Sequence, residues 1–317
     1  MAWEAAGYIC SERLQPFLPD LIPLLKRHRQ LDIDETTETL LVTASVSTVE
    51  RNVAQLRRGL VSRKMSQTKP GSLLRKQIPV IVGHWKEIDK PGYLEVDLVS
   101  HSGEFAVEEW IWTLCATDLS TGWTERLPVM GRGRIAVVAA LDRIYGQLPF
   151  PLLGIHPDNG SEFINYHLVK YCGGDAEGGR PPIILSRSRP HHKNDNAHVE
   201  QKNWTLVRRL IGYQRLDILE QLAWLDALYT ELLRPYNNCF QPVMKLIDKE
   251  SAGQRPRKIY DRPISPLKRV LNSGAADPNK IGDLIELYTA VSPLTLKRKI
   301  DRRLAAMPSA LEVKASA

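Results

Sequence analysis

The 317-residue chain lacks the features that mark secreted, membrane-spanning and zinc-binding proteins. Its four cysteines, Cys10, Cys115, Cys172 and Cys239, are scattered and form no CxxC pair, which argues against a zinc finger or a disulfide framework and predicts free thiols. No apolar run approaches the roughly 18 residues that cross a bilayer. The start, MAWEAAGYICSER, has neither the basic segment nor the long apolar segment of a signal peptide. These absences predict a cytoplasmic protein with no membrane partner.

The charge of the chain is unevenly placed. Hydrophobic residues make up 43% and charged residues 25%, which is ordinary for a soluble globular protein. From Arg255 onward there are 13 Lys/Arg and 6 Asp/Glu, a difference that accounts for the whole net charge of +7. A basic segment of this kind suits binding to a polyanion, and a solvated basic tail is the alternative.

Residues 1–62 are predicted to form a helical domain. Ser11 can cap a first helix, which Pro16, Pro19 and Pro23 are expected to break into short pieces. A second helix is predicted at about Glu35–Val42, followed by a short link.

The next segment has a helix-start signature. Ser47 and Glu50 match a capping box, and Val49, Val53 and Leu56 then recur on one helical face. Two helices joined by a short turn are the layout of a helix-turn-helix, whose second helix enters the major groove of DNA. Ordinary helical packing of a small domain is the alternative. The residues expected to face bases or phosphates are Thr48, Arg51 and Asn52.

The pattern changes after a basic linker at 63–80, which is rich in Pro, Gly and Ser. GYLEVDLVSH, IWTLCATDLS and GWTERLPV predict three antiparallel strands, which are followed by a helix, a strand, a helix, a strand and a long helix. This order predicts an α/β core at 81–234, a mixed sheet covered on both faces. The last region, 235–317, predicts a β-hairpin or small barrel and then helices near 265–272, 279–290 and 293–305.

Three acidic residues stand where rigid elements would present them. Asp97 lies in the first strand, Asp158 follows the fourth strand at a tight turn formed by Asn159 and Gly160, and Glu200 lies near the start of the long helix. Phosphodiester transfer needs charge stabilised on an attacking and a leaving oxygen at once. Two divalent cations held by carboxylates do this.

VDLV, HPDNGSEF and KNDNAHVEQKNW resemble the catalytic signatures of the DDE transposase/integrase superfamily with a retroviral-integrase-type core, especially those of bacterial insertion-sequence transposases. The resemblance is strong over about residues 90–215, and it extends to the helix-turn-helix and to PYNNCFQPVMKL. It implies an RNase H-like fold with a five-stranded mixed sheet, which agrees with the predicted strand order. The segment between Asp158 and Glu200 is somewhat longer than in integrases, and the group often has a further helical unit upstream of MAWEAAGY.

The resemblance also implies a function. Asp97, Asp158 and Glu200 would be the catalytic and metal-binding residues, with two Mg²⁺ ions expected and Mn²⁺ able to substitute. The activity would be metal-dependent DNA cleavage and strand transfer during DNA transposition. The partners would be double-stranded DNA, both element ends and target, and further copies of the chain in a homo-oligomer on DNA at the bacterial nucleoid.

Other polar residues compete for roles near these acids. Asp118 is expected to cap the turn between strands two and three, Glu162 to cap its helix, and His156 to be packed near the site. Asp195 suits a cap or loop bond, and Glu95 shares a strand face with Asp97. The histidines His191, His192 and His198 have no neighbouring cysteine, which argues against zinc.

Several residues around Glu200 are candidate DNA contacts. Asn203 and Trp204 lie three and four residues after Glu200, and so on its side of the helix. Core packing is the favoured role for Trp204, and stacking on a flipped base is the alternative. The candidate contacts in this segment are Lys193, Lys202, Asn203, Arg208 and Arg209.

Two other functions stay open from the sequence. The chain could be a catalytically silent DNA-binding relic or a regulator of a longer transposase, although the retained acids argue against this. It could also be an RNase H-like nuclease with no joining step, against which stand the resemblance and the flanking helix-turn-helix.

Overall fold

The computed structural model describes most of the chain. The described residues are 1–56, 88–103, 108–157, 160, 162–175, 177–187, 203–250 and 257–308, without the side chains of 249, 250 and 257. No helix among them is long and apolar enough to cross a membrane. All four cysteines are described, and all four are free, as predicted.

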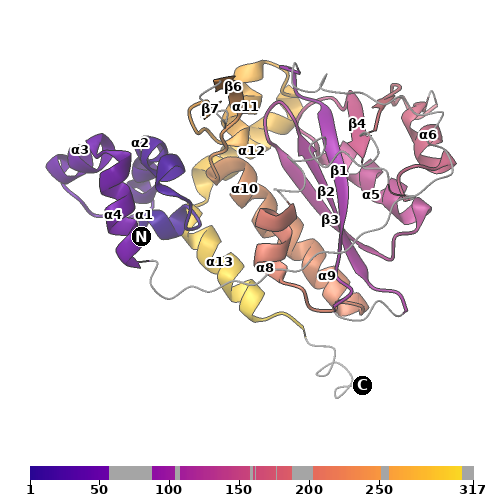
Figure 1. Cartoon of the computed structure of the whole chain (residues 1–317), viewed down its shortest axis with the longest axis horizontal. Coiled ribbons are helices and arrows are strands. Elements are labelled where there is room, and N and C mark those ends of the chain that lie inside the picture. The colour runs from indigo at the N-terminus through magenta and orange to yellow at the C-terminus, as the bar shows by residue number, and fades with distance from the viewer. Residues whose placement is uncertain are drawn as a thin grey trace.

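A five-stranded sheet forms the centre of the larger lobe (Figure 1). Its strands are β1 (Tyr93–Ser100), β2 (Ile111–Asp118), β3 (Thr124–Met130), β4 (Gly154–Pro157) and β5 (Ile184–Leu185). They lie in the order β3-β2-β1-β4-β5, with β1, β2 and β3 antiparallel and with β4 parallel to both β1 and β5. The predicted mixed α/β sheet with flanking helices is confirmed.

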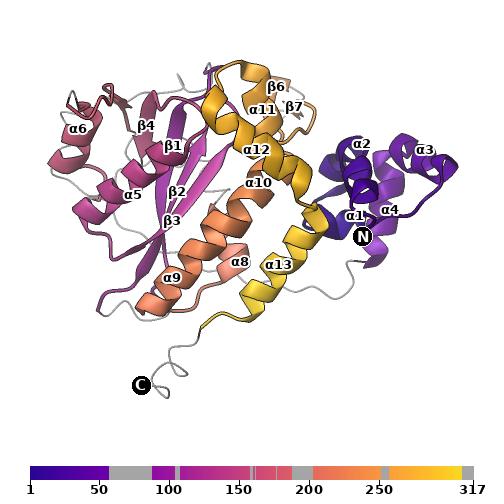
Figure 2. The same cartoon turned by 180° about the vertical axis from the view of Figure 1, so that it is seen from behind.

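Helices cover both faces of this sheet (Figures 1 and 2). On one side lie α5 (Arg134–Gln147) and α6 (Tyr166–Cys172). The other side is covered by the π-helical segment η3 (Trp204–Arg208), α8 (Arg209–Ile211), α9 (Leu219–Ala227), the π-helical segment η4 (Leu228–Leu233) and α10 (Arg234–Phe240). The helical segment that begins at Leu219 therefore runs through Pro235 to Phe240. A proline near a helix start costs no hydrogen bond, and the π-helical segment before it has already shifted the hydrogen-bond register.

The N-terminal helices form a smaller lobe. They are α1 (Ala2–Ala5), α2 (Ser11–Arg27), α3 (Glu35–Thr43) and α4 (Val46–Leu56). α2 is continuous, so the prediction that its prolines break it was wrong. Pro16, Pro19 and Pro23 lie on its more exposed side, where water can bond the carbonyls they leave free, and the buried side is apolar, including Phe17 and Leu21.

The start of α4 also differs from the prediction. Ser45, and not Ser47, accepts the backbone N–H of Thr48, at 3.2 Å. The carboxylate of Glu50 is not used for a capping box, because it accepts a hydrogen bond from the Ser11 hydroxyl at 2.6 Å. The predicted pair of helices is nevertheless present as α3 and α4, and Val53 is buried between α4 and the rest of the lobe.

The C-terminal region joins the two lobes. It contains the predicted hairpin of β6 (Leu246–Glu250) and β7 (Arg257–Tyr260), which among the described residues forms a two-stranded sheet and no barrel. The three predicted helices follow as α11 (Pro266–Ser273), α12 (Pro278–Ala290) and α13 (Pro293–Ala305).

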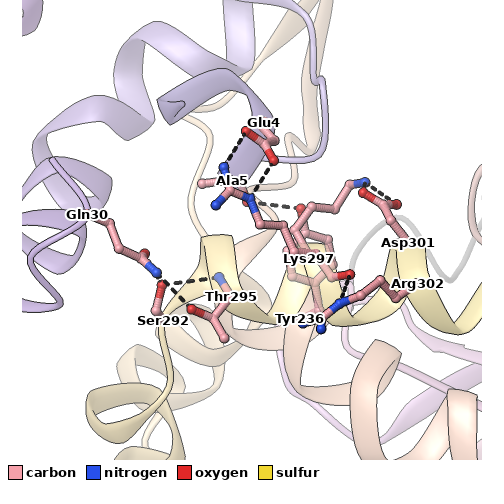
Figure 3. Close-up of polar contacts among 10 residues, drawn as sticks. Glu4, Ala5, Gln30, Tyr236, Ser292, Thr295, Lys297, Asp301 and Arg302 are labelled. Atoms are coloured by element: carbon pink, nitrogen blue, oxygen red, sulfur yellow. Dashed lines mark hydrogen bonds and ion pairs between the residues drawn. The ribbon is translucent and has the colours of Figure 1, made fainter.

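Helix α13 packs against the N-terminal lobe, where polar contacts join distant parts of the chain (Figure 3). Gln30 bonds the hydroxyls of Ser292 and Thr295, and Arg298 pairs with Glu4 at 2.9 Å. The hydroxyl of Tyr236 on α10 donates to the carbonyl of Ala5 at 2.9 Å. Part of the basic C-terminal run is therefore used within the chain.

Candidate active site

Asp97 is half-buried in β1, on the face of the sheet that α8, α9 and α10 cover. One carboxylate oxygen accepts the backbone N–H of Leu98 at 2.8 Å. The other accepts the side-chain amide of Asn203 at 2.5 Å, across 106 residues of sequence. The structure therefore brings together two of the residues that the sequence singled out.

Strand β4 ends beside Asp97. The two parallel strands are paired in register from Gly154 with Tyr93 to Pro157 with Val96. Pro157 is the last residue of β4. Asp97 follows Val96 in the sequence, and Asp158 follows Pro157. Asp158 and Asn159 lie outside the described residues, as does Glu200.

Asn203 is the first described residue of the last core segment, and it leads into η3. Its side chain is 8% exposed, and its amide oxygen has no hydrogen-bond partner among the described residues. Across the described part of the chain, no three His, Cys, Asp or Glu side chains are grouped to hold a metal ion. Two of the three predicted ligands, Asp158 and Glu200, are not in that part.

Trp204 corrects one expectation. Its side chain is 39% exposed, so the favoured role in core packing was wrong, because the side chain of η3 that fills the core is Val207. Arg208 is half-buried, with its guanidinium 4.9 Å from the ring centre of Tyr213, and burial lowers the pKa of Arg208.

The turn at the end of β2 confirms the expected role of Asp118. Its carboxylate accepts the backbone N–H and the hydroxyl of Thr121 at 2.7 and 2.6 Å and the N–H of Gly92 at 2.8 Å. Burial nevertheless raises the pKa of Asp118, against the effect of these hydrogen bonds. Asp118 therefore holds a turn, and it is not a metal-ligand candidate.

Three further residues near the site have structural partners. His156 is buried, and its Nδ1 lies 2.9 Å from the hydroxyl of Ser186, which confirms its expected packing. Asn165, and not Glu162, caps α6 by accepting the N–H of Leu168 at 3.1 Å. A carboxylate of Glu162 instead lies 3.9 Å from Arg132.

Of the three predicted DNA contacts in the N-terminal lobe, two are exposed and one is half-buried. Arg51 and Asn52 are exposed on α4, and Thr48 is half-buried. The amide of Asn52 donates to the carbonyl of Thr48 at 2.9 Å, and Leu56 is 69% exposed and so does not pack on the Val53 side. Lys193 and Lys202, like Asp195 and the three clustered histidines, lie outside the described residues.

Sequence reasoning missed a buried polar network beside Asp97. Nε2 of His101 lies 2.8 Å from the hydroxyl of Thr113, which lies 2.8 Å from the hydroxyl of Tyr229. Burial lowers the pKa of His101 to about 3 and raises that of Tyr229 to about 12. The guanidinium of Arg126 lies 5.3 Å from the Tyr229 ring centre. An arginine in an alternating strand is usually exposed, so only the fold reveals this one.

Comparison with known proteins adds one relative. The chain is 40% identical over 270 residues to "Uncharacterized protein y4rM" of Sinorhizobium fredii (strain NBRC 101917 / NGR234), a match that covers 84% of this chain and 74% of the relative. This chain belongs to the y4rM family. No protein-family profile matches it.

Among solved structures, the catalytic core domain of BIV integrase aligns with 57% of this chain and 95% of its own, at 14% identity and a TM-score of 0.34. The five-stranded sheet of this member of the y4rM family agrees, in strand order and direction, with the predicted RNase H-like fold.

Proposed function

We propose that this chain is a DDE-type DNA transposase/integrase, with Asp97, Asp158 and Glu200 as its metal-binding catalytic residues. The observation that carries the proposal is the register of β4 on β1. Pro157 pairs with Val96, so a continued pairing would set Asp158 beside Asp97. Parallel neighbouring strands end at the same edge of a sheet, which is where ligands bind in open α/β sheets.

The contact between Asn203 and Asp97 supports the proposal that Glu200 is the third metal-binding residue. Glu200 precedes Asn203 by three residues, a span that no backbone conformation can stretch beyond about 11 Å. If the helix extends back from Asn203, Glu200 lies one turn earlier, on the same side as Asn203. A glutamate on that side has a side chain long enough to share an ion with Asp97.

The donor set fits a hard divalent cation. Asp97 offers carboxylate oxygens, and the buried amide oxygen of Asn203 beside it lacks a hydrogen-bond donor among the described residues. Oxygen ligands of this kind suit Mg²⁺ and Mn²⁺. Asp97, Asp158 and Glu200 would hold two ions, which when bound stabilise the charge that develops on the attacking and leaving oxygens.

The chemistry follows from an in-line displacement at phosphorus. In the first step a water oxygen attacks a phosphorus at the element end, the bond to the 3′ oxygen breaks, and that oxygen leaves as a 3′-hydroxyl. In the second step this hydroxyl attacks a target phosphorus, and a target 3′-hydroxyl leaves. The hydrogen bonds from Leu98 and Asn203 orient the carboxylate of Asp97, which would serve as a ligand in both steps. No serine or tyrosine nucleophile is needed.

DNA binding belongs to the same proposal. Arg51 and Asn52 on α4 would contact an element end, Lys193, Lys202 and Arg208 would contact phosphates, and the exposed Trp204 is available to stack on a base. The chain would act as a homo-oligomer on paired ends, in the cytoplasm at the nucleoid.

The test uses labelled duplexes taken from the genomic DNA on either side of the gene. The parent is expected to release 3′ ends and to join them to target DNA in Mg²⁺ or Mn²⁺. Asp158→Asn and Glu200→Gln should bind the same duplexes and join none. Asp283→Asn and Glu286→Gln remove the same charges from the exposed side of α12, outside the proposed catalytic residues, and they should join DNA as the parent does.

Two results would contradict the proposed enzymatic activity. Joining by the Asp158→Asn and Glu200→Gln variants at the parent's rate would remove the catalytic role of these acids. A parent that shifts the mobility of the duplexes and yields no joined product, even in Mn²⁺, would instead be a silent DNA-binding regulator or relic.

A further inference from the structure

Arg126 is an arginine inside the core of the sheet. It lies on β3 and pairs across to Cys115 on β2, which pairs in turn with Asp97 on β1. Directly opposed residues of neighbouring antiparallel strands point to the same face, so Arg126 lies on the face that carries Asp97. Only 3% of its surface is exposed.

The guanidinium joins three elements. One terminal nitrogen donates to the backbone carbonyl of Leu206 in η3 at 2.8 Å. The group also lies over the ring of Tyr229 in η4, 5.3 Å from the ring centre. Its other two nitrogens have no hydrogen-bond partner among the described residues.

The two partners of Arg126 are both in π-helical segments, which are rare and recur at functional sites. A π-helical segment shifts the hydrogen-bond register, so a carbonyl within it can be left without its usual helical donor. Arg126 donates to the carbonyl of Leu206 in one of these segments, and the ring of Tyr229 in the other lies against its charge. One side chain therefore fixes two irregular turns against β3.

Stability alone does not account for a charge in this place. Burying a guanidinium carries a desolvation penalty, and replacing buried charges by apolar side chains is often neutral or stabilising. No ion pair to Arg126 is found in the described part of the chain. Its contacts do, however, hold η3 three residues beyond Asn203, whose amide meets Asp97.

We infer that Arg126 is a positioning residue for the proposed strand-transfer reaction, and this inference rests on that proposed function. By bonding the Leu206 carbonyl it sets the position of η3 and of Asn203 at its start, three residues after Glu200 in the sequence. It touches neither DNA nor the reacting atoms. A displacement of about 1 Å in such a helix is enough to cost about 100-fold in rate.

The test compares three full-length variants with the parent. Arg126→Met keeps the stem and removes every donor, Arg126→Lys keeps the charge and one donor nitrogen, and Arg134→Met removes a charge from the exposed start of α5 as a matched control. The first readout is the joining of labelled DNA ends, resolved into kcat and the KM for DNA. The second is amide hydrogen exchange along residues 203–211, compared with α5.

The methionine variant should lose about 100-fold in kcat with an unchanged KM for DNA, and its amides at 203–211 should exchange faster while those of α5 do not. Lysine should restore most of the rate and of the protection from exchange, because its ammonium keeps the charge beside Tyr229 and has N–H groups that can donate to the Leu206 carbonyl. The control should match the parent. Should the methionine variant not fold, Tyr229→Leu, which removes the ring under the guanidinium, should likewise speed exchange at 203–211.

Parental kcat and exchange in Arg126→Met would overturn the inference, as would a lysine variant as impaired as the methionine variant. After Tyr229→Leu, faster exchange confined to α9 and α10 would overturn it too. A parent that joins no DNA would defeat the proposed function alone, because the exchange measurement still decides whether Arg126 fixes residues 203–211.

Discussion

The two faces of the central sheet come from the same strands and are built differently. The face toward α5 presents Leu94, Val96 and Leu98 of β1, with Leu114 of β2 and Leu127 of β3 beside them. The face toward α8, α9 and α10 presents polar side chains in the matching positions. They are Asp97, Thr113, Cys115 and Arg126.

The difference separates two contributions to this core, burial of apolar surface and fixed positions of polar side chains. The apolar face contributes through burial, since each large aliphatic side chain contributes about 1.5–3 kcal/mol relative to an exposed one. The polar face gains little net stability from its hydrogen bonds, but each side chain on it has a defined partner and so a defined position. Asp97 belongs to the face that specifies geometry.

The largest expected effect is the loss of DNA joining in Asp97→Asn, a change on the polar face. Loss of one carboxylate charge from a metal site removes several kcal/mol of transition-state stabilisation, so joining should fall by about 1000-fold or more. The fold should survive, because asparagine can still bond Asn203. Single-turnover joining assays, with circular dichroism as the control for folding, test this. Activity within a few fold of the parent would break the assignment of function to the polar face.

On the apolar face, Leu114→Ala is expected to change stability and leave the chemistry intact. Leu114 is fully buried, and removing its side chain leaves a cavity that costs about 2–5 kcal/mol. Urea unfolding should show a lower midpoint, while kcat, measured where the variant is folded, stays near that of the parent. A selective loss of kcat would mean that the two faces are not separable.

Thr113→Val sharpens the comparison within the polar face. Valine keeps the shape of threonine but removes the hydroxyl shared by His101 and Tyr229, which leaves two buried polar groups unsatisfied. The expected loss is about 1–3 kcal/mol. Urea unfolding of Thr113→Val, of Tyr229→Phe and of the double variant gives the coupling between the residues, and full additivity would contradict a connected network.

Over a single pH unit, the smallest expected effect is a dependence of stability on pH. Burial holds the pKa of His101 at about 3, below its usual value of 6.5, so between these values the unfolded chain binds a proton that the folded chain does not. Stability should therefore fall as the pH drops below 6.5, by up to about 1.4 kcal/mol per unit. The difference in unfolding free energy between the parent and His101→Gln should shrink over this range. A constant difference would contradict a buried neutral histidine.

The sequence predicted most elements because their signals are local. The alternation in GYLEVDLVSH and the helical spacing in RIAVVAALDRIYGQL show which side of each element is buried. Burial of that side is what stabilises the strand in the first case and the helix in the second. The failures involve contacts between distant segments. The prolines of α2 are tolerated because its opposite side packs in the N-terminal lobe, and Glu50 leaves the predicted capping box for Ser11, 39 residues away.

The residues of the candidate site also divide into those that local pattern predicted and those that depend on contacts between distant segments. Asp97 could be chosen from its place in a strand and from the family resemblance, and its contact with Asn203 agrees with that choice. Arg126 and the exposure of Trp204 could not be foreseen, because both depend on how η3 packs on the sheet. Local pattern is enough to propose the residues that carry the chemistry, whereas the residues that would hold them in place depend on tertiary packing.

The central claim is that Asp97, Asp158 and Glu200 converge on the same metal ions, and cleavage of the chain by bound Fe²⁺ tests it directly. Iron bound in place of Mg²⁺ and treated with ascorbate and peroxide generates radicals that cut the nearby backbone. The account predicts cuts near residues 97, 158 and 200 together, suppressed by excess Mg²⁺ and all lost in Asp97→Asn. Cuts at one segment alone, or cuts at the other two that persist in Asp97→Asn, would contradict it.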